Sequence, residues 1–298
     1  MGVIARAQHI PVLSRHPAFE LVATCDRRSG ETGGTIQFTD HRRMLAALPE
    51  LDAVAICTPP GVRASIAYDA LSAGKHVLLE KPPTSTVNEL EELAALACEK
   101  GPSLFAAWHS RYQLGLARFR NEVRHRALGR FEITWSEDVR EWHPGQDWIW
   151  DRKGLGVFDA GINAFAMVTD LVDGPLGVID CELTYPSNRQ APIAARLKLR
   201  EVNSGAEITA TFNWRWEGPP CWEIVSHDGA VRLTAGGRRL EIDGRLVVDA
   251  PPDEYRLIYN RFDELVSAGA SEVDGEPLRL VSEAFSIARG RQVEPFFW

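Results

Sequence analysis

The sequence predicts an α/β protein in which a doubly wound parallel sheet is followed by an α+β domain with a large, open, mainly antiparallel sheet. In the first hundred residues, short apolar segments alternate with segments of helix length, as in parallel sheets that are covered on both faces. Beyond residue 130, longer segments alternate apolar and polar residues, as in strands with one buried face. We therefore expect two domains, residues 1–108 and 109–298, joined without a flexible linker.

Three buried strands are predicted in the N-terminal domain, each followed by a polar cluster. They span residues 19–25, 53–57 and 76–79, and the clusters are Asp26-Arg27-Arg28, Thr58-Pro59-Pro60 and Glu80-Lys81-Pro82. Helices are predicted over residues 63–73 and 87–100, each closed by a glycine. Ligands of doubly wound sheets bind beyond the carboxyl ends of the strands, so the clusters mark the expected binding region, although solvated turns occur there too.

The C-terminal domain is predicted to contain a series of strands followed by two helices. The strands span residues 177–186, 193–202, 207–216, 222–226, 231–235 and 246–249, and the helices span 253–268 and 277–289. In the clearest strand, Phe212, Trp214 and Trp216 share one face. We expect a second subunit to cover this apolar stripe, which predicts a homodimer through the C-terminal sheet.

Composition and charge argue against several classes of protein. A net charge of -8 without a basic stripe makes nucleic-acid binding unexpected. No apolar run approaches the ~20 residues that cross a bilayer, and no signal region opens the chain, so we expect no membrane span and a cytoplasmic location. The five widely spaced cysteines fit reduced thiols in that compartment. The histidines show no zinc-ligand spacing, so no metal site is predicted.

The first polar cluster bears on a dinucleotide cofactor. Asp26 is placed to accept hydrogen bonds from the adenosine ribose hydroxyls, which favours NAD. Arg27 and Arg28 fit a 2′-phosphate, which favours NADP. The same residues fit a solvated turn at a helix entry, so this pattern leaves the cofactor preference open.

Lys81 and the pair Asp159 and Asn163 are the strongest candidates for catalysis. Lys81 directly follows a buried strand, and beside a cationic nicotinamide ring its neutral amine would be favoured and could take a proton. An exposed lysine at a strand end is the alternative. Asp159 and Asn163 lie one helical turn apart and can position a hydroxyl group together, unless Asp159 only caps the helix.

An aromatic-rich stretch precedes this helix. It contains Trp135, Glu137, Trp142, His143, Trp148 and Trp150. Sugars present apolar ring faces and polar edges, so tryptophans beside acid and imidazole groups suit a sugar pocket, although tryptophans on a sheet are also common in cores and interfaces. His109 closes a predicted fourth strand and is expected at the same crevice, with a structural histidine as the alternative.

In layout, the whole chain resembles the Gfo/Idh/MocA family of sugar-type oxidoreductases. The residues that carry the resemblance are Ile4-Ala5, Cys57-Thr58-Pro59-Pro60, the run G-K-H-V-L-L-E-K-P that ends at Pro82, and the Asp159–Asn163 helix. The aldose 1-dehydrogenase branch is similar in further motifs, which are Trp108-His109-Ser110-Arg111, Glu137 and Trp142-His143-Pro144. Asn163 also matches that branch, whereas many other members have histidine there.

The resemblance implies a Rossmann-type cofactor domain and a set of residue roles. The implied NAD or NADP contacts are Gly2, Ile4, Asp26, Arg27, Thr58, Pro59, Pro60, Glu80 and Lys81. Lys81 would be the base, Asp159 would orient it and adjust its protonation, and Asn163 would position the anomeric hydroxyl. The implied contacts of the sugar are completed by His109, Glu137, Trp142 and His143.

We therefore expect an oxidoreductase that transfers hydride from C1 of an aldose of the D-galactose or L-arabinose type to NAD(P), giving the aldonolactone. One alternative is oxidation of another polyol, an inositol or a dihydrodiol. Another is a non-catalytic, dinucleotide-dependent sugar sensor that regulates through protein contacts. The retention of Lys81, Asp159 and Asn163 argues against the sensor, which needs no base.

The start of the chain departs from the family pattern. The family opens with a strand and the motif G-x-G-x-I-A, whereas this chain begins Met1-Gly2-Val3-Ile4-Ala5, so only Gly2 of the glycine set is present. The missing strand would be central in the sheet, and its absence would leave backbone groups of its neighbours unpaired. We expect the chain as numbered to bind dinucleotide weakly and to unfold easily, and an upstream extension of about 10 residues to restore both properties.

Overall fold

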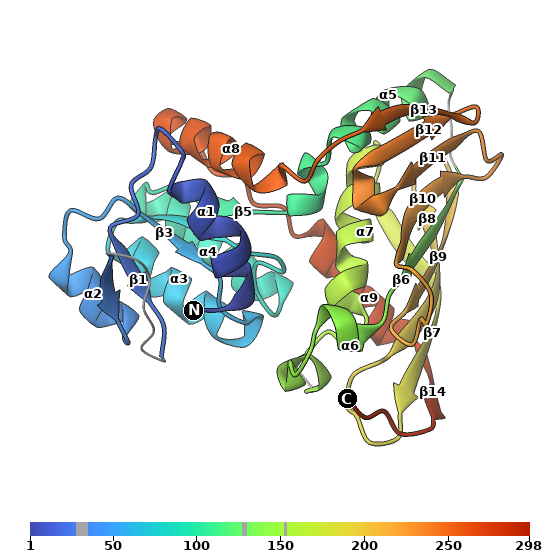
Figure 1. Cartoon of the computed structure of the whole chain (residues 1–298), viewed down its shortest axis with the longest axis horizontal. Coiled ribbons are helices and arrows are strands. Elements are labelled where there is room, and N and C mark those ends of the chain that lie inside the picture. Colours follow the sequence, from blue (N-terminus) through green and yellow to red (C-terminus); the bar gives the residue numbers. More distant parts are fainter. Residues whose placement is uncertain (28–34, 127–129, 152–153) are drawn as a thin grey trace. The chain divides into compact units, whose positions relative to one another are not determined.

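The structure, a computed structural model, describes residues 1–27, 35–126, 130–151 and 154–298 (Figure 1). Its contacts divide the chain into two compact units. Unit 1 comprises Met1–His109 and Asp253–Gly275, and unit 2 comprises Ser110–Pro252 and Glu276–Trp298.

This division corrects the expected domains, 1–108 and 109–298, because residues 253–275 return to unit 1. The return is explained by helix α8 (Glu254–Ala268), which carries an apolar face that includes Tyr259 and Phe262. Phe19 packs on this face, with ring centroids 5.5 Å from Tyr259 and 5.9 Å from Phe262. The helix therefore completes the core of the unit that the first third of the chain begins.

Unit 1 contains two separate parallel sheets. The first pairs β1 (Ala23–Cys25) with β2 (Ile36–Phe38), and the second has the order β3 (Ala53–Ile56), β4 (His76–Leu79), β5 (Leu104–Ala106). Within the described part of unit 1, no strand connects the two sheets, as the missing central strand predicts. Strand β1 is shorter than the predicted 19–25 because Phe19 packs on α8 instead of extending the strand.

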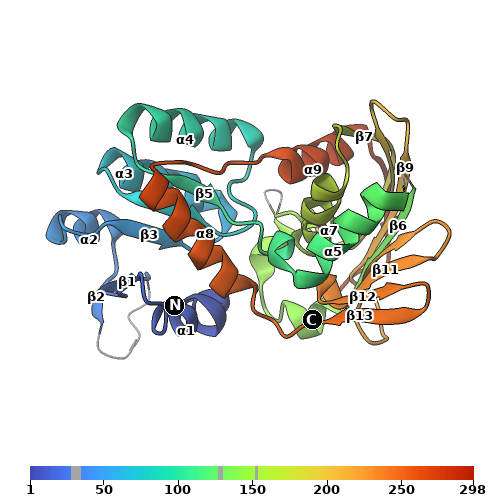
Figure 2. The same ribbon diagram turned by 90° about the horizontal axis from the view of Figure 1, so that it is seen from above.

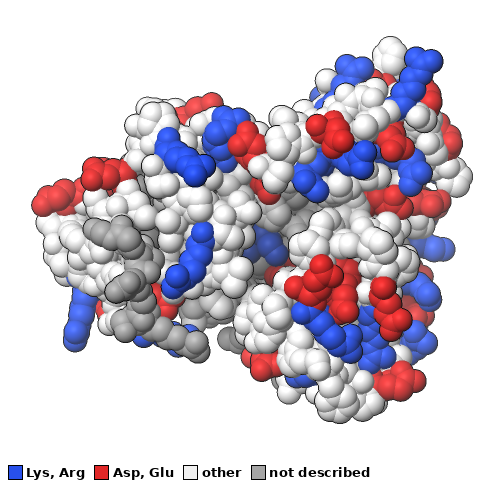
Figure 3. Space-filling model, in the orientation of Figure 1, with Lys and Arg blue, Asp and Glu red and all other residues white. Residues whose placement is uncertain are grey.

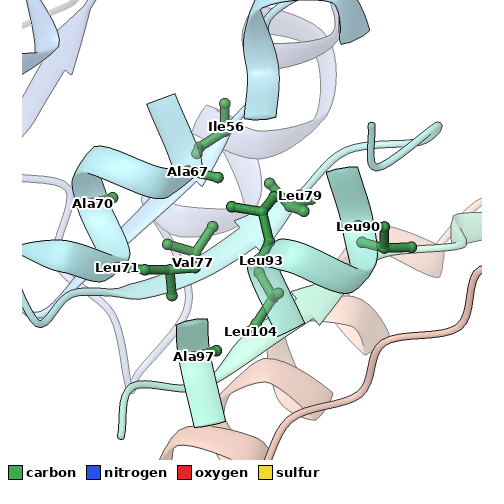
Figure 4. Close-up of a cluster of buried hydrophobic side chains, with 10 residues drawn as sticks. All are labelled: Ile56, Ala67, Ala70, Leu71, Val77, Leu79, Leu90, Leu93, Ala97 and Leu104. Atoms are coloured by element: carbon green, nitrogen blue, oxygen red, sulfur yellow. The ribbon is translucent and has the colours of Figure 1, made fainter. Parts of the chain in front are cut away.

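Helices cover both faces of the three-stranded sheet (Figure 2). The helices of unit 1 are η1 (Ala5–His9), α1 (Ile10–Leu13), α2 (His41–Ala47), α3 (Pro60–Ser72), α4 (Val87–Lys100) and α8. Helix α3 begins earlier than the predicted residue 63, because the fixed φ of Pro60 suits a first helical turn. Alternation along β5 separates the two cores: Leu104 joins the cluster beneath α3 and α4 (Figure 4), and Phe105 faces Phe262 of α8.

Unit 2 is built on one nine-stranded sheet in the order β13-β12-β11-β10-β6-β9-β8-β7-β14. Its strands are β6 (Phe131–Ser136), β7 (Leu176–Pro186), β8 (Ala194–Glu201), β9 (Glu207–Asn213), β10 (Cys221–Ser226), β11 (Val231–Thr234), β12 (Arg239–Ile242), β13 (Arg245–Asp249) and β14 (Arg289–Val293). The described neighbours are antiparallel except for β6 with β9 and β7 with β14, which confirms a mainly antiparallel sheet.

Helices α5 (Leu114–Arg126), α7 (Phe158–Leu171) and α9 (Glu276–Ile287) lie on one face of this sheet (Figure 1). The shorter helical elements are η2 (His109–Tyr112), α6 (Val139–Trp142), η3 (Asp147–Trp150) and η4 (Ala235–Gly237). Strand β9 ends before the predicted Trp216, because the Asn213 side chain accepts a hydrogen bond from the Arg215 amide at 2.9 Å and turns the chain.

Two of the three residues of the predicted apolar stripe are covered inside unit 2. Phe212 and Trp214 are 0% exposed, and the Phe212 ring lies 5.8 Å from Phe158 and 5.3 Å from Phe165 of α7. Trp216 lies beyond the strand and donates its indole N–H to the Pro219 carbonyl at 2.7 Å. Unit 2 itself therefore covers Phe212 and Trp214, so these two residues do not need the expected second subunit, whereas Trp216 is 39% exposed. A homodimer through the sheet stays a prediction.

Acidic and basic side chains are interspersed on the face of the molecule shown in Figure 3. Oppositely charged side chains also pair between neighbouring strands of the nine-stranded sheet, as Arg289 does with Asp180 at 2.7 Å and Arg200 with Glu207 at 2.8 Å. Exposed pairs of this kind contribute little stability individually. In the described ranges, no helix combines the length and apolarity that crossing a bilayer requires.

Candidate active site

The loop that carries Lys81 is held by hydrogen bonds with two residues of unit 1, Arg63 and Glu80. Arg63 of α3, which is buried, donates hydrogen bonds to the backbone carbonyls of Thr58, Glu80 and Pro82. The guanidinium therefore joins the chain beyond β3 to the chain beyond β4. Lys81 is half-buried and precedes a cis peptide bond to Pro82.

Glu80 is the second anchor of this loop. Its side chain is buried and accepts three hydrogen bonds: from the Lys81 amide at 2.8 Å, from the Tyr255 hydroxyl at 2.5 Å and from His9 Nε2 at 3.0 Å. Burial by itself would raise the pKa of Glu80, but the hydrogen bond and charge of His9 outweigh burial and hold that pKa well below its usual range. Glu80 is therefore an ionised carboxylate inside unit 1.

His9 lies on the widened helical turn η1. Pro11 has no N–H to offer the carbonyl one turn earlier, which accounts for the irregular turn that precedes it. His9 is buried, and its Nδ1 lies 2.8 Å from the Tyr259 hydroxyl. Burial opposes protonation, but the electrostatic interactions and hydrogen bonds with Cys57 and Glu80 outweigh it and raise the pKa of His9 to about 10. His9 and Glu80 thus form a buried ion pair.

The segment Thr58-Pro59-Pro60 links β3 to α3 and fits part of a dinucleotide. Pro60 occupies the first turn of a 13-residue helix, whose N-terminus is favourable for phosphate oxygens. Thr58 Oγ1 is buried and has no hydrogen-bond partner among the residues that the structure describes. A buried hydroxyl without a partner beside a helix N-terminus suits a polar ligand.

The other predicted cofactor residues lie at the N-terminal edge of unit 1. Asp26 follows β1, and its Oδ2 lies 2.8 Å from the amino group of Met1. Arg27 is exposed, and Arg28 lies outside the described residues. Gly2 is exposed and Ile4 half-buried, and an added Cβ on Gly2 would meet no atom within 4 Å. These contacts leave the preference between NAD and NADP open.

In unit 2, Glu137 follows β6 and accepts hydrogen bonds from two indole N–H groups. Trp214 donates its Nε1–H to Glu137 Oε1 at 3.1 Å, and Trp222 donates to Oε2 at 2.7 Å. The sheet order β10-β6-β9 explains the arrangement, because β6 lies between β10, which contains Trp222, and β9, which Trp214 follows. His143 Nε2 lies 3.3 Å from the same Oε1. The carboxylate is buried, so its main contacts within unit 2 are these rings.

The predicted aromatic stretch divides between core and surface. Trp135 and Trp150 are buried, as the core alternative predicts for them. Trp142 is 43% exposed and meets Trp222 edge to face, with ring centroids 4.7 Å apart. Trp142 and Trp222 therefore offer an aromatic surface beside Glu137.

Asp159 and Asn163 lie on successive turns at the start of α7, as predicted. Asp159 does not cap the helix, because Val157 is the N-cap residue and makes no side-chain cap. Asp159 Oδ2 lies 3.7 Å from His143 Nδ1, so that imidazole stands between Glu137 and Asp159. Asn163 Oδ1 is buried without a hydrogen-bond partner in the described part of the chain, which leaves an acceptor for a ligand hydroxyl.

His109 belongs to unit 1 and lies against Tyr255, the residue whose hydroxyl donates a hydrogen bond to Glu80. It follows β5 at the start of η2, and its ring stacks on Tyr255 with centroids 5.9 Å apart. His9, Arg63 and Tyr255 are not predicted as site residues from the sequence, and Trp214 and Trp222 are predicted only as residues of strands. A polar residue within an otherwise apolar helix face was the one local signal for Arg63 and His9. For the others, the partners are too distant in the sequence to be inferred.

The His9–Glu80 pair predicts a pH-dependent contribution to stability. Because folding raises the pKa of His9 from 6.5 to about 10, this contribution is complete below pH 6.5 and is lost as the pH rises to about 10. Folding lowers the pKa of Glu80 from 4.5, so its contribution is present above pH 4.5 and is lost as the pH falls toward the folded value. The melting temperature of His9→Gln should therefore lie furthest below that of the wild type between pH 4.5 and 6.5. A gap of equal size at about pH 10 would contradict the charged pair.

Known proteins match this chain along its length. Residues 1–107 match the oxidoreductase family with an NAD-binding Rossmann fold. Galactose 1-dehydrogenase of Pseudomonas fluorescens is 39% identical over 303 residues, which cover 99% of this chain and 96% of that protein. D-glucoside 3-dehydrogenase of Escherichia coli is 30% identical over 146 residues, which cover 47% of this chain and 41% of that protein.

Solved structures agree with this result. The D-galactose-1-dehydrogenase from Rhizobium etli superposes with a TM-score of 0.94 at 44% identity, covering 100% of this chain and 96% of that one. A 3-ketoreductase from Actinomadura kijaniata shares the fold, with a TM-score of 0.83 at 20% identity and coverage of 98% and 97%. These matches confirm the predicted family and the Rossmann-type α/β fold. The chain belongs to the Gfo/Idh/MocA family of NAD-binding oxidoreductases.

Proposed function

We propose that the chain is an NAD(P)-dependent aldose 1-dehydrogenase that oxidises C1 of a D-galactose- or L-arabinose-type sugar to the aldonolactone. The observation that carries the proposal is the unit 2 cluster, in which Glu137 fastens Trp222 beside exposed Trp142 and His143 stands near Asp159. Aromatic faces with few, fixed polar groups suit a sugar ring. Whole-length similarity to two galactose 1-dehydrogenases supports the choice of sugar.

The proposed roles follow from what each side chain can do. When bound, a nicotinamide dinucleotide supplies the hydride acceptor. Lys81 removes the proton of the C1 hydroxyl as the C1 hydrogen leaves with its electron pair, so that the carbonyl of the lactone forms. Asn163 Oδ1 accepts a hydrogen bond from the sugar, which satisfies its otherwise unpartnered oxygen. Asp159 orients the catalytic amine and adjusts its protonation.

The geometry refines the role expected for Glu137. Its two oxygens already accept indole N–H groups, so we propose that it orients Trp214 and Trp222 in addition to meeting a sugar hydroxyl. Trp222 joins Trp142 as an apolar surface for the sugar ring. His143 and His109 complete the proposed hydroxyl contacts. A cytoplasmic location is part of the proposal, and the five cysteines are all free thiols, as a reducing compartment favours.

A screen of aldoses with NAD and NADP, followed through the absorbance of the reduced nicotinamide, tests the proposal. We expect D-galactose or L-arabinose to be the best substrate and both cofactors to be used with a modest preference, because Asp26 and Arg27 occupy one loop. A preference of about 1,000-fold, equal to ~4 kcal/mol in the barrier, would contradict dual use. Oxidation of polyols or inositols alone would identify another chemistry of the family. Sugar-dependent dinucleotide binding without turnover would identify a sensor.

A further inference from the structure

The position of Lys81 depends on its neighbour in the sequence. Lys81 lies beyond the last residue of β4, and its backbone N–H is bonded to Glu80 Oε2 at 2.8 Å. The side chain of Glu80 thus folds onto the amide of the next residue. Any displacement of this carboxylate moves the backbone from which the Lys81 amine extends.

The carboxylate is held by segments that are distant in the sequence. His9 approaches from the N-terminal helix at 3.0 Å, and Tyr255 approaches from α8 at 2.5 Å. Tyr259, one turn along α8, lies 2.8 Å from the second nitrogen of His9. His9 and Glu80 are 2% and 4% exposed, so neither charge is stabilised by bulk water.

A buried ion pair is a costly way to stabilise a protein. Desolvation offsets much of the attraction between the charges, and apolar side chains of similar size commonly serve stability as well or better. Here the pair meets the backbone of the residue assigned to proton transfer. Such an arrangement fixes the position of the Lys81 backbone and adds little to the stability of the protein.

We propose that His9, Glu80 and Tyr255 are positioning residues that hold the Lys81 amine in its reactive place, an inference that rests on the proposed function of Lys81. The imidazolium keeps Glu80 ionised and in contact with the Lys81 amide. Without it, the buried carboxylate takes up a proton or moves, and Lys81 loses one of the two anchors of its loop, while Arg63 still holds the neighbouring carbonyls. A displacement of about 1 Å from such a change can lower turnover by ~10²-fold.

The experiment compares His9→Gln with a matched control in the same unit. His41 makes a similar pair with Asp69 at 2.7 Å, between α2 and α3, and we assign it no part in catalysis. His9→Gln is expected to lower kcat by ~10- to 100-fold, whereas His41→Gln leaves kcat unchanged. Tyr255→Phe removes one donor and keeps both charges, so an intermediate loss of kcat is expected even if His9→Gln folds poorly.

A second readout does not depend on turnover. The sequence has five lysines, so reductive methylation with a carbon-13 label yields few NMR signals, and Lys81→Arg identifies that of Lys81. The Lys81 signal and its titration should shift in His9→Gln and Tyr255→Phe but not in His41→Gln. Variants that melt lower yet keep the wild-type kcat and Lys81 titration would overturn the proposal. A wild type that oxidises no aldose, with a Lys81 signal that still responds to His9→Gln, would refute the proposed function and support the positioning role.

Discussion

Replacement of Lys81 by alanine is expected to lower kcat by ~10²–10⁴-fold, the usual effect of removing a general base. The backbone N–H of residue 81 still bonds Glu80, and Arg63 still holds the neighbouring carbonyls, so the loop should keep its fold. Steady-state kinetics with the best aldose, together with thermal melting, separate the loss of the base from a loss of structure.

Lys75→Ala is the matched control. Lys75 lies just before β4 in the same unit, and its amine bonds the Pro49 carbonyl at 2.5 Å on an exposed surface. Its kcat should equal that of the wild type. If Lys81→Ala stays within about threefold of wild-type turnover, a change of less than ~1 kcal/mol in the barrier, Lys81 is not the base.

Replacement of Gly156 by alanine is expected to destabilise unit 2 by ~2–5 kcal/mol, from ~1–2 kcal/mol of left-handed backbone strain and ~1–3 kcal/mol of overpacking. Gly156 has φ +54°, and an added Cβ would lie 2.3 Å from the Pro192 carbonyl oxygen. That oxygen cannot move freely, because it accepts the Val157 amide at 2.8 Å. At ~2–4 °C per kcal/mol for a unit of this size, the melting temperature should fall by about 10 °C.

Gly205→Ala separates the two causes. Gly205 also has a positive φ, +72°, but an added Cβ there would meet no atom within 4 Å. It should show the backbone strain alone, ~1–2 kcal/mol. If both variants lose the same free energy of unfolding, the Pro192 carbonyl moves away from the added Cβ at little cost. The Gly156 variant should also bind sugar more weakly, because the displaced turn begins α7 and therefore carries Asp159.

Local signals in the sequence predict the elements whose causes are local. Strand β4 occupies the predicted residues 76–79, because its apolar run is continuous and ends in polar residues. Helix α4 begins and ends as predicted, with a capping box from Thr86 and Glu89 and a left-handed Gly101 at its end. The same reasoning places Asp159 and Asn163 on one helix.

The rest of the candidate site depends on partners that no local pattern specifies. Glu137 and Trp222 become neighbours only because β6 pairs with β10, which is distant from it in the sequence. His9 contacts Glu80, which is 71 residues away in the sequence, and Tyr259 of α8, which is 250 residues away. Such contacts are settled by packing among distant segments rather than by periodicity.

The return of α8 to unit 1 has a consequence for the order in which this protein is made. A ribosome releases the first 109 residues long before Asp253–Gly275, and unit 2 emerges between them. During that interval, the nascent N-terminal segment lacks Tyr255 and Tyr259, and its Phe19 and Phe105 have no α8 to cover them. Domains usually complete their folding in the order of synthesis. Here the larger, C-terminal unit is the one whose sheet can largely assemble first, and the unit that begins the chain is closed late.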